Sequence, residues 1–376
     1  MKIYLNDAGN GDSIILATEN TTIMIDGGTA ASYNIWKKNV SEINKIDALF
    51  VTHIDNDHIN GLIRMFEEKA HPVINEIFYN GIEQVTNSEF CQDDSHNEES
   101  SILDSMISNF SDDVEGQSNI GFSEGTSLSF LLRELSYNVN ERFDGKVITN
   151  TSKPNVFSIG DVTIEIIGPS NENISSIKNN WLEVLSEYGV KRKLINKKCS
   201  VAFEKYIDSL RGDLDVEDIC EASDESIENL SNKPFIDDNS LNNMSSISFI
   251  AECNKKKILL LGDSDARTIL EWMDCRGYET INVDAVKLPH HGSKHNYNKE
   301  LLERILCNKY LISTNGRKHS HPDLETLARI VRYSKKQPVN IFINHSISHI
   351  DESFKEKVSN YSPGSNILTE EREVLL

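Results

Sequence analysis

The stretch Thr52-His53-Ile54-Asp55-Asn56-Asp57-His58 decides how this 376-residue sequence is interpreted. It follows an apolar run, Asp47–Val51, that we expect to be a strand buried on both faces. A helix is expected over Asn60–Glu68, so the stretch forms a loop at the edge of a sheet. It contains the four potential metal ligands His53, Asp55, Asp57 and His58. Imidazole suits zinc and carboxylate oxygens suit harder ions such as manganese, so a mixed set can hold two ions. The alternative is a polar loop with a chance pair of histidines.

Similar residues follow later apolar runs. Leu259–Leu261 is followed by Gly262 and Asp263, whose carboxylate could bridge two metals or cap the next helix. Val286–Leu288 is followed by Pro289-His290-His291-Gly292-Ser293, where one histidine could be a ligand and the other could face a substrate. The sequence does not decide between His290 and His291.

A fourth cluster, Asn315-Gly316-Arg317-Lys318-His319-Ser320-His321-Pro322, also follows an expected strand. His321 could contact a substrate oxyanion or donate a proton. His319 is a weaker candidate, for which a structural role is the better interpretation.

Expected strands and helices alternate along most of the chain, which predicts an α/β fold with sheets covered by helices. The expected strands are Lys2–Leu5, Ser13–Ala17, Thr22–Ile25, Asp47–Val51, Glu76–Tyr79, Val162–Ile167, Ser246–Glu252, Lys257–Leu261, Ala285–Leu288, Tyr310–Ser313 and Asn340–Ile343. The expected helices are Ser32–Val40, Asn60–Glu68, Leu128–Leu135, Trp181–Tyr188, Ala266–Cys275, Lys299–Leu306 and Asp323–Tyr333.

The formal net charge of −21 is concentrated in the middle of the chain. Residues 84–240 carry 30 acidic and 13 basic side chains, whereas the rest carries 29 and 25. We therefore divide the chain into a first core half (1–83), an acidic insertion (84–240) and a second core half (241–376). The insertion is expected to be partly helical, and its strand near residues 162–168 could belong to the main sheet. Two polar segments of the insertion, Thr86–Gly125 and Asp215–Asn243, could be flexible or loosely packed. The insertion could also dock a protein partner, and its charge disfavours a long polyanion.

Other features indicate a soluble protein of a reducing compartment. No apolar run approaches the roughly 20 residues needed to span a bilayer. The first residues, Met1–Asp7, become acidic too early for a signal peptide. The six cysteines are widely spread without a CxxC pair. We expect a cytoplasmic location and no membrane partner.

The ordered motifs together resemble the metallo-β-lactamase superfamily. More narrowly, the sequence resembles the hydrolase domain of the ComEC-type competence proteins and their soluble relatives. Four further segments support the resemblance, in family order: Asn6–Asp12, Met24–Gly28, Asn243–Ser246, and Gly316 with His321-Pro322.

The resemblance implies a four-layer αββα sandwich with two divalent metal ions, Zn2+ or Mn2+, at one sheet edge. It makes His53, Asp55, Asp57 and His58 ligands, with Asp263 as the bridge and His290 or His291 completing the second site. Asp12 and Asp26 would orient the ligands from behind. Catalysis would rely on a metal-activated hydroxide oriented by Asp57 and Asp263, with His321 or His290 assisting the leaving oxygen.

Two departures from the family pattern affect the metal site. Asp55 stands where many members have histidine, which makes the site harder and favours manganese over zinc. The third family motif usually supplies a histidine before the Gly-Asp strand, and this chain offers no convincing one. His71 comes too early, and His96 lies in a polar stretch.

The resemblance favours a phosphodiesterase or nuclease, with DNA as the expected family substrate. A small nucleotide or a phosphocholine-like ester is the alternative substrate, which the acidic insertion favours. A different possibility is a non-catalytic component of a bacterial defence or signalling assembly, with the insertion as its docking surface. Nothing in the sequence is specific for lactamase or thioesterase activity.

Overall fold

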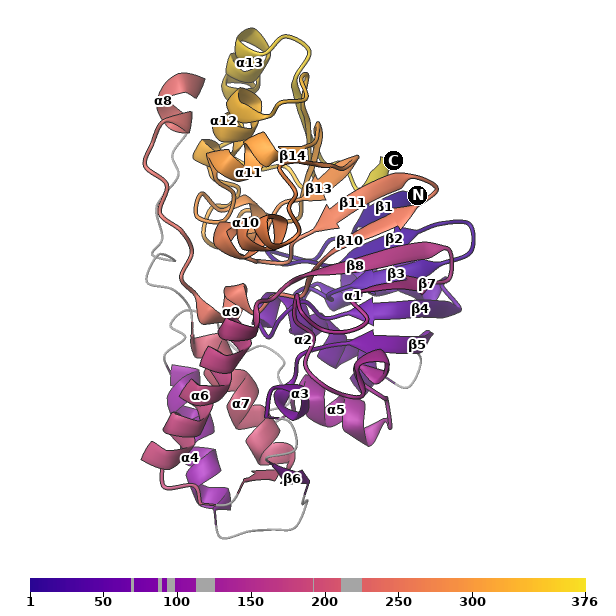
Figure 1. The fold of residues 1–376 in the computed structure, drawn as a ribbon, viewed down its shortest axis with the longest axis vertical. Coiled ribbons are helices and arrows are strands. Elements are labelled where there is room, and N and C mark those ends of the chain that lie inside the picture. Colours follow the sequence, from indigo (N-terminus) through magenta and orange to yellow (C-terminus); the bar gives the residue numbers. More distant parts are fainter. Residues whose placement is uncertain (69–70, 87–89, 93–98, 113–125, 192, 211–224) are drawn as a thin grey trace.

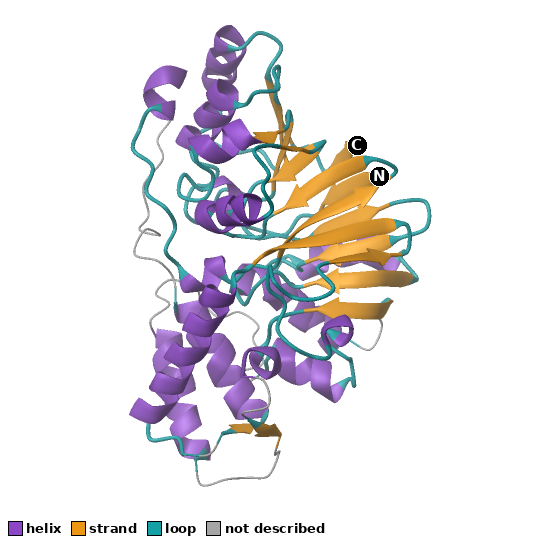
Figure 2. Ribbon diagram, viewed as in Figure 1, coloured by secondary structure: helices purple, strands orange, loops and turns teal. Residues whose placement is uncertain are grey.

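The computed structural model describes residues 1–376 except 69–70, 87–89, 93–98, 113–125, 192 and 211–224. Two large sheets dominate the fold (Figure 2). In spatial order, the six-stranded sheet contains β18 (Glu373–Leu375), β1 (Lys2–Leu5), β2 (Ile14–Ala17), β3 (Thr22–Ile25), β4 (Lys45–Phe50) and β5 (Val73–Phe78). The eight-stranded sheet contains β17 (Asn366–Thr369), β16 (Asn340–Ile343), β15 (Lys309–Ile312), β13 (Ala285–Lys287), β11 (Lys256–Leu260), β10 (Ser248–Cys253), β8 (Val162–Gly168) and β7 (Val156–Ile159). Two short pairs, β6 (Cys91–Gln92) with β9 (Leu194–Ile195) and β12 (Ile281–Asn282) with β14 (Ile305–Leu306), complete the strands.

Three hydrophobic cores divide the molecule into four layers. The central core joins the facing sides of both sheets, where Phe50 of the first sheet stacks on Phe249 of the second with ring centroids 4.2 Å apart. Outside the first sheet, α1 (Tyr33–Ser41) and α2 (Asn56–Glu67) cover the second core. Outside the second sheet lie α10 (Ala266–Cys275), α11 (Lys299–Arg304), α12 (Leu324–Tyr333) and α13 (Glu352–Tyr361). The order helix–sheet–sheet–helix confirms the predicted αββα architecture.

Parallel pairing brings the functional loops to one edge. Strands β3, β4 and β5 are parallel, as are β11, β13, β15, β16 and β17. Their carboxyl ends therefore point the same way within each sheet. Hydrogen bonds from Ile247 N to Thr52 O (2.8 Å) and from Asn315 N to Gly9 O (2.9 Å) join the loops of the two halves. The sequence motifs thus meet at the edge that both sheets share.

Part of the acidic region belongs to the core. As expected for Val162–Gly168, strand β8 lies in the main sheet, between β10 and β7. The other described parts of this region are largely helical: α3 (Ile82–Thr86, which begins just before it), α4 (Ser100–Asp112), α5 (Leu128–Glu134), η2 (Glu141–Phe143), α6 (Asn171–Glu187), α7 (Lys197–Ser209) and α8 (Ile227–Ser231). The short helix α9 (Leu241–Met244) follows directly after the region.

The helices α4, α6 and α7 form a packed group beyond the first sheet (Figure 1). Trp181 of α6 is fully buried against Phe203 and Tyr206 of α7. The prediction of loose packing is therefore wrong for α4, which lies within Thr86–Gly125, because its apolar face joins the same core as α7. Residues 113–125 and 215–224 of the two polar segments lie outside the described residues, as does His96.

Two expected helices begin earlier than their apolar patterns indicated. Helix α2 begins at Asn56 rather than Asn60, so Asp57 and His58 lie in its first turn and not on a loop. Helix α6 begins at Asn171 rather than Trp181, because the Ser170 side chain accepts a hydrogen bond from Asn173 N. No described helix is long and apolar enough to cross a membrane.

Candidate metal centre

Three buried imidazole nitrogens converge on one carboxylate. The Nε2 atoms of His53, His58 and His291 lie 3.8, 3.4 and 3.8 Å from Oδ2 of Asp263. Among the described residues, none of these three atoms has a hydrogen-bond partner. A buried polar atom without a partner is costly, and an Nε2 lone pair is also a good ligand for a divalent cation. The donor set therefore fits a metal site.

The hydrogen bonds on the other side of two rings fix their tautomers. His58 Nδ1 lies 2.8 Å from Asp26 Oδ2, and His291 Nδ1 lies 2.9 Å from the Ser313 carbonyl oxygen. Because both partners only accept, each Nδ1 carries a proton, and in the neutral ring each Nε2 keeps its lone pair. Asp26 is held by the Thr52 amide and hydroxyl, at 2.8 and 2.7 Å. It lies behind the cluster, where the sequence placed it.

Asp57 completes a second group beside the first. Its Oδ1 lies 4.0 Å from His58 Nε2, and its Oδ2 lies 3.7 Å from His291 Nε2. One candidate group is therefore His53, His58 and Asp263, and the other is Asp57, His58 and His291. His58 belongs to both groups, and Asp263 Oδ2 of the first lies 3.8 Å from His291 Nε2 of the second.

The charges of this cluster favour a cation. Although burial lowers the pKa of His58, Asp263 and Asp26 together hold it well above its usual range. Burial has the opposite effect on a carboxyl group and raises the pKa of Asp263, but His58 and His291 hold this pKa well below the ordinary carboxyl value. The carboxylates thus create a strongly negative interior, which protons or metal ions can neutralise.

Asp12 lies behind His291 in a buried ion pair. Its Oδ2 pairs with the ammonium group of Lys287, and both residues are 1% exposed. Its Oδ1 lies 3.4 Å from His291 Nδ1. Burial raises the pKa of Asp12, but Lys287 outweighs it and brings the pKa to about 2. Asp12 therefore remains ionised next to His291. A third group of potential ligands, Asp12, Asp26 and His58, lies on this rear side.

The structure separates His290 from His291. Both have positive φ angles, 45° and 52°. His291 reaches Asp57 and Asp263, whereas His290 Nδ1 lies 3.4 Å from Asp238 Oδ2 and 3.2 Å from Asn296 Oδ1. The geometry favours His291 as the ligand and places His290 beside the cluster.

Asp55 and His321 lie at the opening of the same small pocket. Asp55 precedes the first turn of α2 in an extended conformation. His321 packs against His290 with ring centroids 5.3 Å apart, and its Nδ1 lies 3.4 Å from Asp323 Oδ2. Burial lowers the pKa of His321, so its ring is neutral at pH 7. The pocket is lined by Asn10, Asp55, Asp57, Asn243, Asp263, His290, His291, Thr314, Lys318, His319 and His321.

Three residues of this region were not singled out from the sequence. Asn10 donates to Asp57 Oδ2, Lys318 brings a positive charge to the pocket, and Asn242 contacts Asp55. Asn10 lies in the motif Asn6–Asp12 and Lys318 lies in the cluster Asn315–Pro322, so the sequence motifs could have indicated that both are near the centre. Asn242 directly precedes a recognised motif and carried no such signal.

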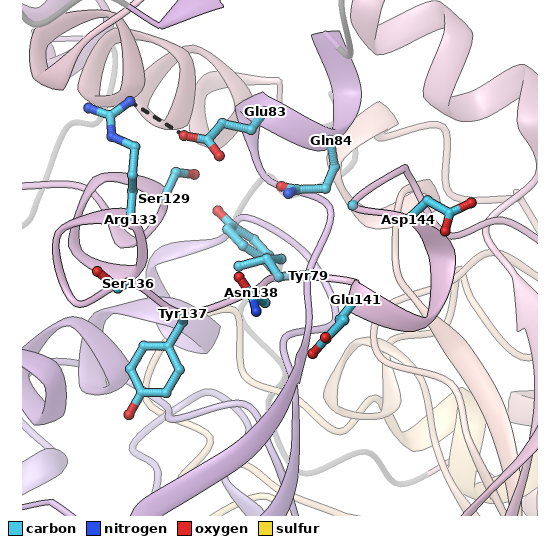
Figure 3. Close-up of a pocket in the computed structure, with 12 residues that line it drawn as sticks. Tyr79, Glu83, Gln84, Ser129, Arg133, Ser136, Tyr137, Asn138, Glu141 and Asp144 are labelled. Carbon is cyan, nitrogen blue, oxygen red and sulfur yellow. Dashed lines mark hydrogen bonds and ion pairs between the residues drawn. The ribbon is translucent and has the colours of Figure 1, made fainter.

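A larger cavity of about 500 Å3 lies elsewhere, beside α3 and α5 (Figure 3). Its wall includes the ion pair of Glu83 and Arg133, 3.4 Å apart, and the carboxamide of Gln84. Tyr79 of this wall donates a hydrogen bond to the buried carboxylate of Glu204. None of the predicted site residues lines this cavity, so its size does not mark the candidate centre.

Comparisons with known proteins agree with the chemistry of the first half. Residues 6–77 match the family model of the metallo-β-lactamase superfamily. This segment contains Asp12, Asp26 and the whole cluster from His53 to His58. The microtubule-associated protein 1A of human, mouse and rat is 32% identical over 67 residues. These residues are 18% of this chain, and the chain spans only 2% of the length of those relatives.

Several solved structures are similar at low identity. PqqB from Methylobacterium extorquens, solved with Zn2+, is 9% identical with a TM-score of 0.41, and all of both chains is covered. YhfI from Bacillus subtilis, a metallo-β-lactamase fold protein, is 8% identical with a TM-score of 0.36, covering 100% of this chain and 99% of that one. Human tRNase Z, short form, is 10% identical with a TM-score of 0.36, covering 83% and 91%.

Proposed function

We propose that this chain is a metal-dependent hydrolase that cleaves phosphodiesters. The observation that carries the proposal is the convergence of three buried, unpartnered Nε2 atoms on Asp263. Proteins rarely leave such atoms unsatisfied without a functional reason. The sequence resemblance to ComEC-type hydrolases supports the choice of a phosphodiester as the substrate.

Two divalent ions, Zn2+ or Mn2+, would be held at this centre. Asp57, His58 and His291 would hold one ion, and His53, His58 and Asp263 the other, with Asp55 of the same pocket as a further oxygen donor. When bound, such ions supply an acidified water molecule and stabilise negative charge on the reacting group.

The side chains around the pocket would orient and neutralise the substrate. Lys318 offers a positive charge near Asp57, where it also helps to lower the pKa of that carboxyl group. Such a charge attracts an anionic phosphodiester more strongly than a neutral amide. The Asn10 side chain fixes Asp57 through its Oδ2. The neutral ring of His321 can donate a hydrogen bond to the leaving oxygen.

The charge of the molecule favours a small substrate over a long nucleic acid. Residues 84–240 carry 30 acidic and 13 basic side chains, and some of them come close to the centre. Asp208 of α7, for example, contacts Asn56 at the start of α2. The negative charge of this region repels a polyanion at long range more than it repels a single phosphodiester.

The proposal is tested by measuring metal content and hydrolysis together. Wild type and Asp57→Ala are analysed for bound metal and assayed on bis-p-nitrophenyl phosphate with added Mn2+ or Zn2+. We expect about two ions per wild-type chain and at least about a 100-fold loss of activity in the variant. A single-stranded oligonucleotide, assayed in parallel, decides between a nuclease and a small-molecule esterase.

The exposed ion pair of Lys2 and Glu373 offers a control, since Glu373→Gln alters charge far from the centre. This variant should keep its metal and its activity. Wild-type protein that binds metal but cleaves neither substrate under either ion would refute the hydrolase proposal.

A further inference from the structure

Asn242 carries an unsatisfied carboxamide next to the centre. It lies in α9 and is 0% exposed. Its Oδ1 has no hydrogen-bond partner among the described residues, and its Nδ2 makes only a long contact of 3.5 Å to Asp55 Oδ2. A buried carbonyl oxygen without a partner is destabilising. This position therefore needs an explanation.

The side chain of the neighbouring Asn243 has the hydrogen bond that the side chain of Asn242 lacks. The Nδ2 of Asn243 donates to Asp238 Oδ2 at 2.8 Å, which satisfies that amide. The backbone of Asn242 is also satisfied, because its carbonyl accepts from Ser245 Oγ at 2.6 Å. Only the side chain of Asn242, the part that approaches Asp55, is left without a good partner.

Rotation of the amide by 180° brings its oxygen to Asp55 without moving any other atom. The oxygen and nitrogen of a carboxamide have nearly the same shape, so the pocket accepts either orientation. Two oxygen atoms in contact repel each other unless a cation lies between them. An oxygen of Asn242 facing Asp55 is thus favourable only with a metal ion present.

The two candidate groups differ in the oxygen donors beside them. One group consists of Asp57, His58 and His291. The other consists of His53, His58 and Asp263, and Asp55, which Asn242 contacts, lines the same pocket. An amide oxygen would complete this second set and make it richer in oxygen than the first. Oxygen-rich sets prefer Mn2+ to Zn2+.

We propose that the Asn242 carboxamide oxygen is a ligand of the ion held by His53, Asp55 and Asp263, and that this set selects Mn2+. The inference rests on the proposed metal-dependent function but concerns one residue and one of the two ions. A chain without this ligand would still hold the ion beside His58 and His291.

Mn2+ titration of metal-free protein, followed by electron paramagnetic resonance, tests the ligand role without relying on activity. Asn242→Leu removes the oxygen at similar volume and should weaken one class of Mn2+ binding at least about tenfold. Asn242→Asp keeps an oxygen and should bind Mn2+ as tightly as wild type or more tightly. If Asn242 acts instead as a hydrogen-bond donor to Asp55, the Asp variant will bind more weakly than wild type, which overturns the proposal.

Asn242→His and a matched control complete the experiment. The His variant should exchange Mn2+ for Zn2+ more readily than wild type in competition. Asn173→Leu removes a buried amide of α6 that donates to Met244 O at 3.0 Å. Met244 lies on α9 with Asn242, but this contact does not involve Asp55. Asn173→Leu should leave Mn2+ binding unchanged. Equal weakening in this control, or unchanged binding in Asn242→Leu, contradicts the ligand role.

Failure of this inference is distinguishable from failure of the proposed function. If wild-type protein binds no divalent ion, the metal centre itself is refuted. If wild type binds its ions and the Asn242 variants bind them equally well, only the role of Asn242 is refuted. Thermal melting of each metal-free variant verifies that the chain is folded.

Discussion

At the residue scale, the most consequential side chain outside the ligand set is Lys287. It is fully buried, and Asp12 neutralises it directly behind His291. We expect Asp12→Asn to cost about 3–5 kcal/mol in the free energy of unfolding, because the ammonium group is left buried and unpaired. Urea denaturation of the metal-free protein measures this cost. Glu373→Gln, which breaks an exposed pair with Lys2, should cost at most about 1 kcal/mol. Equal costs would contradict the interpretation.

Asp323 provides a pH-dependent contribution at the same scale. Burial raises its pKa, but the hydrogen bond and charge of His321 outweigh this and bring the pKa to about 2. A carboxyl group whose pKa is lowered by folding stabilises the protein above its unfolded pKa of about 3.9. This contribution, about 2 kcal/mol, is lost as the pH falls from about 4 to 2.

The matching measurement compares wild type with Asp323→Asn. The difference between their free energies of unfolding should be largest between pH 5 and 7 and should shrink steadily below about pH 4. Denaturant titrations at several pH values give this difference. A difference that stays constant down to pH 3 would show that protonation of Asp323 does not change the free energy of unfolding.

At the scale of elements, the first turn of α2 depends on a helix of the acidic region. Asp208 of α7 is 3% exposed and accepts hydrogen bonds from the amide and side chain of Asn56, the residue between Asp55 and Asp57. The acidic region therefore supports the candidate centre from its side. This gives α7 a structural role that does not depend on any docking partner.

We expect Asp208→Ala to weaken metal binding about tenfold, as typical for residues that orient ligands, and to cost about 1 kcal/mol of stability. Isothermal titration with Mn2+ and thermal melting measure the two effects. Asp104→Ala is the control, since it breaks the exposed pair of α4 with Lys198 of α7 without touching α2. Metal affinity unchanged by Asp208→Ala would exclude the supporting role.

At the scale of the whole molecule, the candidate centre joins both halves of the chain. His53, Asp57 and His58 follow β4 in the first sheet, whereas Asp263 and His291 follow β11 and β13 in the second. The termini also meet, because β18 pairs with β1 in the first sheet (Figure 1). Bound ions should therefore stabilise the fold as a unit.

Metal addition at 100 times the dissociation constant should stabilise the native state by about 2.7 kcal/mol per site. We expect Mn2+ or Zn2+ to raise the melting temperature by several degrees and a chelator to reverse the change. Differential scanning calorimetry measures both shifts. Asp263→Asn should lose most of the response, because its Oδ2 lies within 3.8 Å of the Nε2 atoms of all three histidines. A melting temperature that does not change with added metal would show that the candidate centre does not stabilise the fold by binding metal.

The sequence by itself determined the α/β class, most strands and the residues at the candidate centre, because these depend on local patterns. An apolar run followed by His and Asp predicts a strand with polar residues at its end, whatever lies around it. The sequence also predicted that Val162–Gly168 joins the core. The predicted ranges for α2 and α6 were too short at their amino ends for the same reason. Their first turns carry few apolar residues, so the local pattern did not mark them as helical.

Tertiary structure decided the rest. Only the approach of His291 Nε2 to Asp57 and Asp263 and the position of the Ser313 carbonyl single out His291. Only folding reveals that Lys287 is buried against Asp12, that Asp208 reaches Asn56 and that Asn242 approaches Asp55. These pairs are separated by 275, 152 and 187 residues. Their contacts depend on the pairing of sheets and helices, which no local pattern encodes.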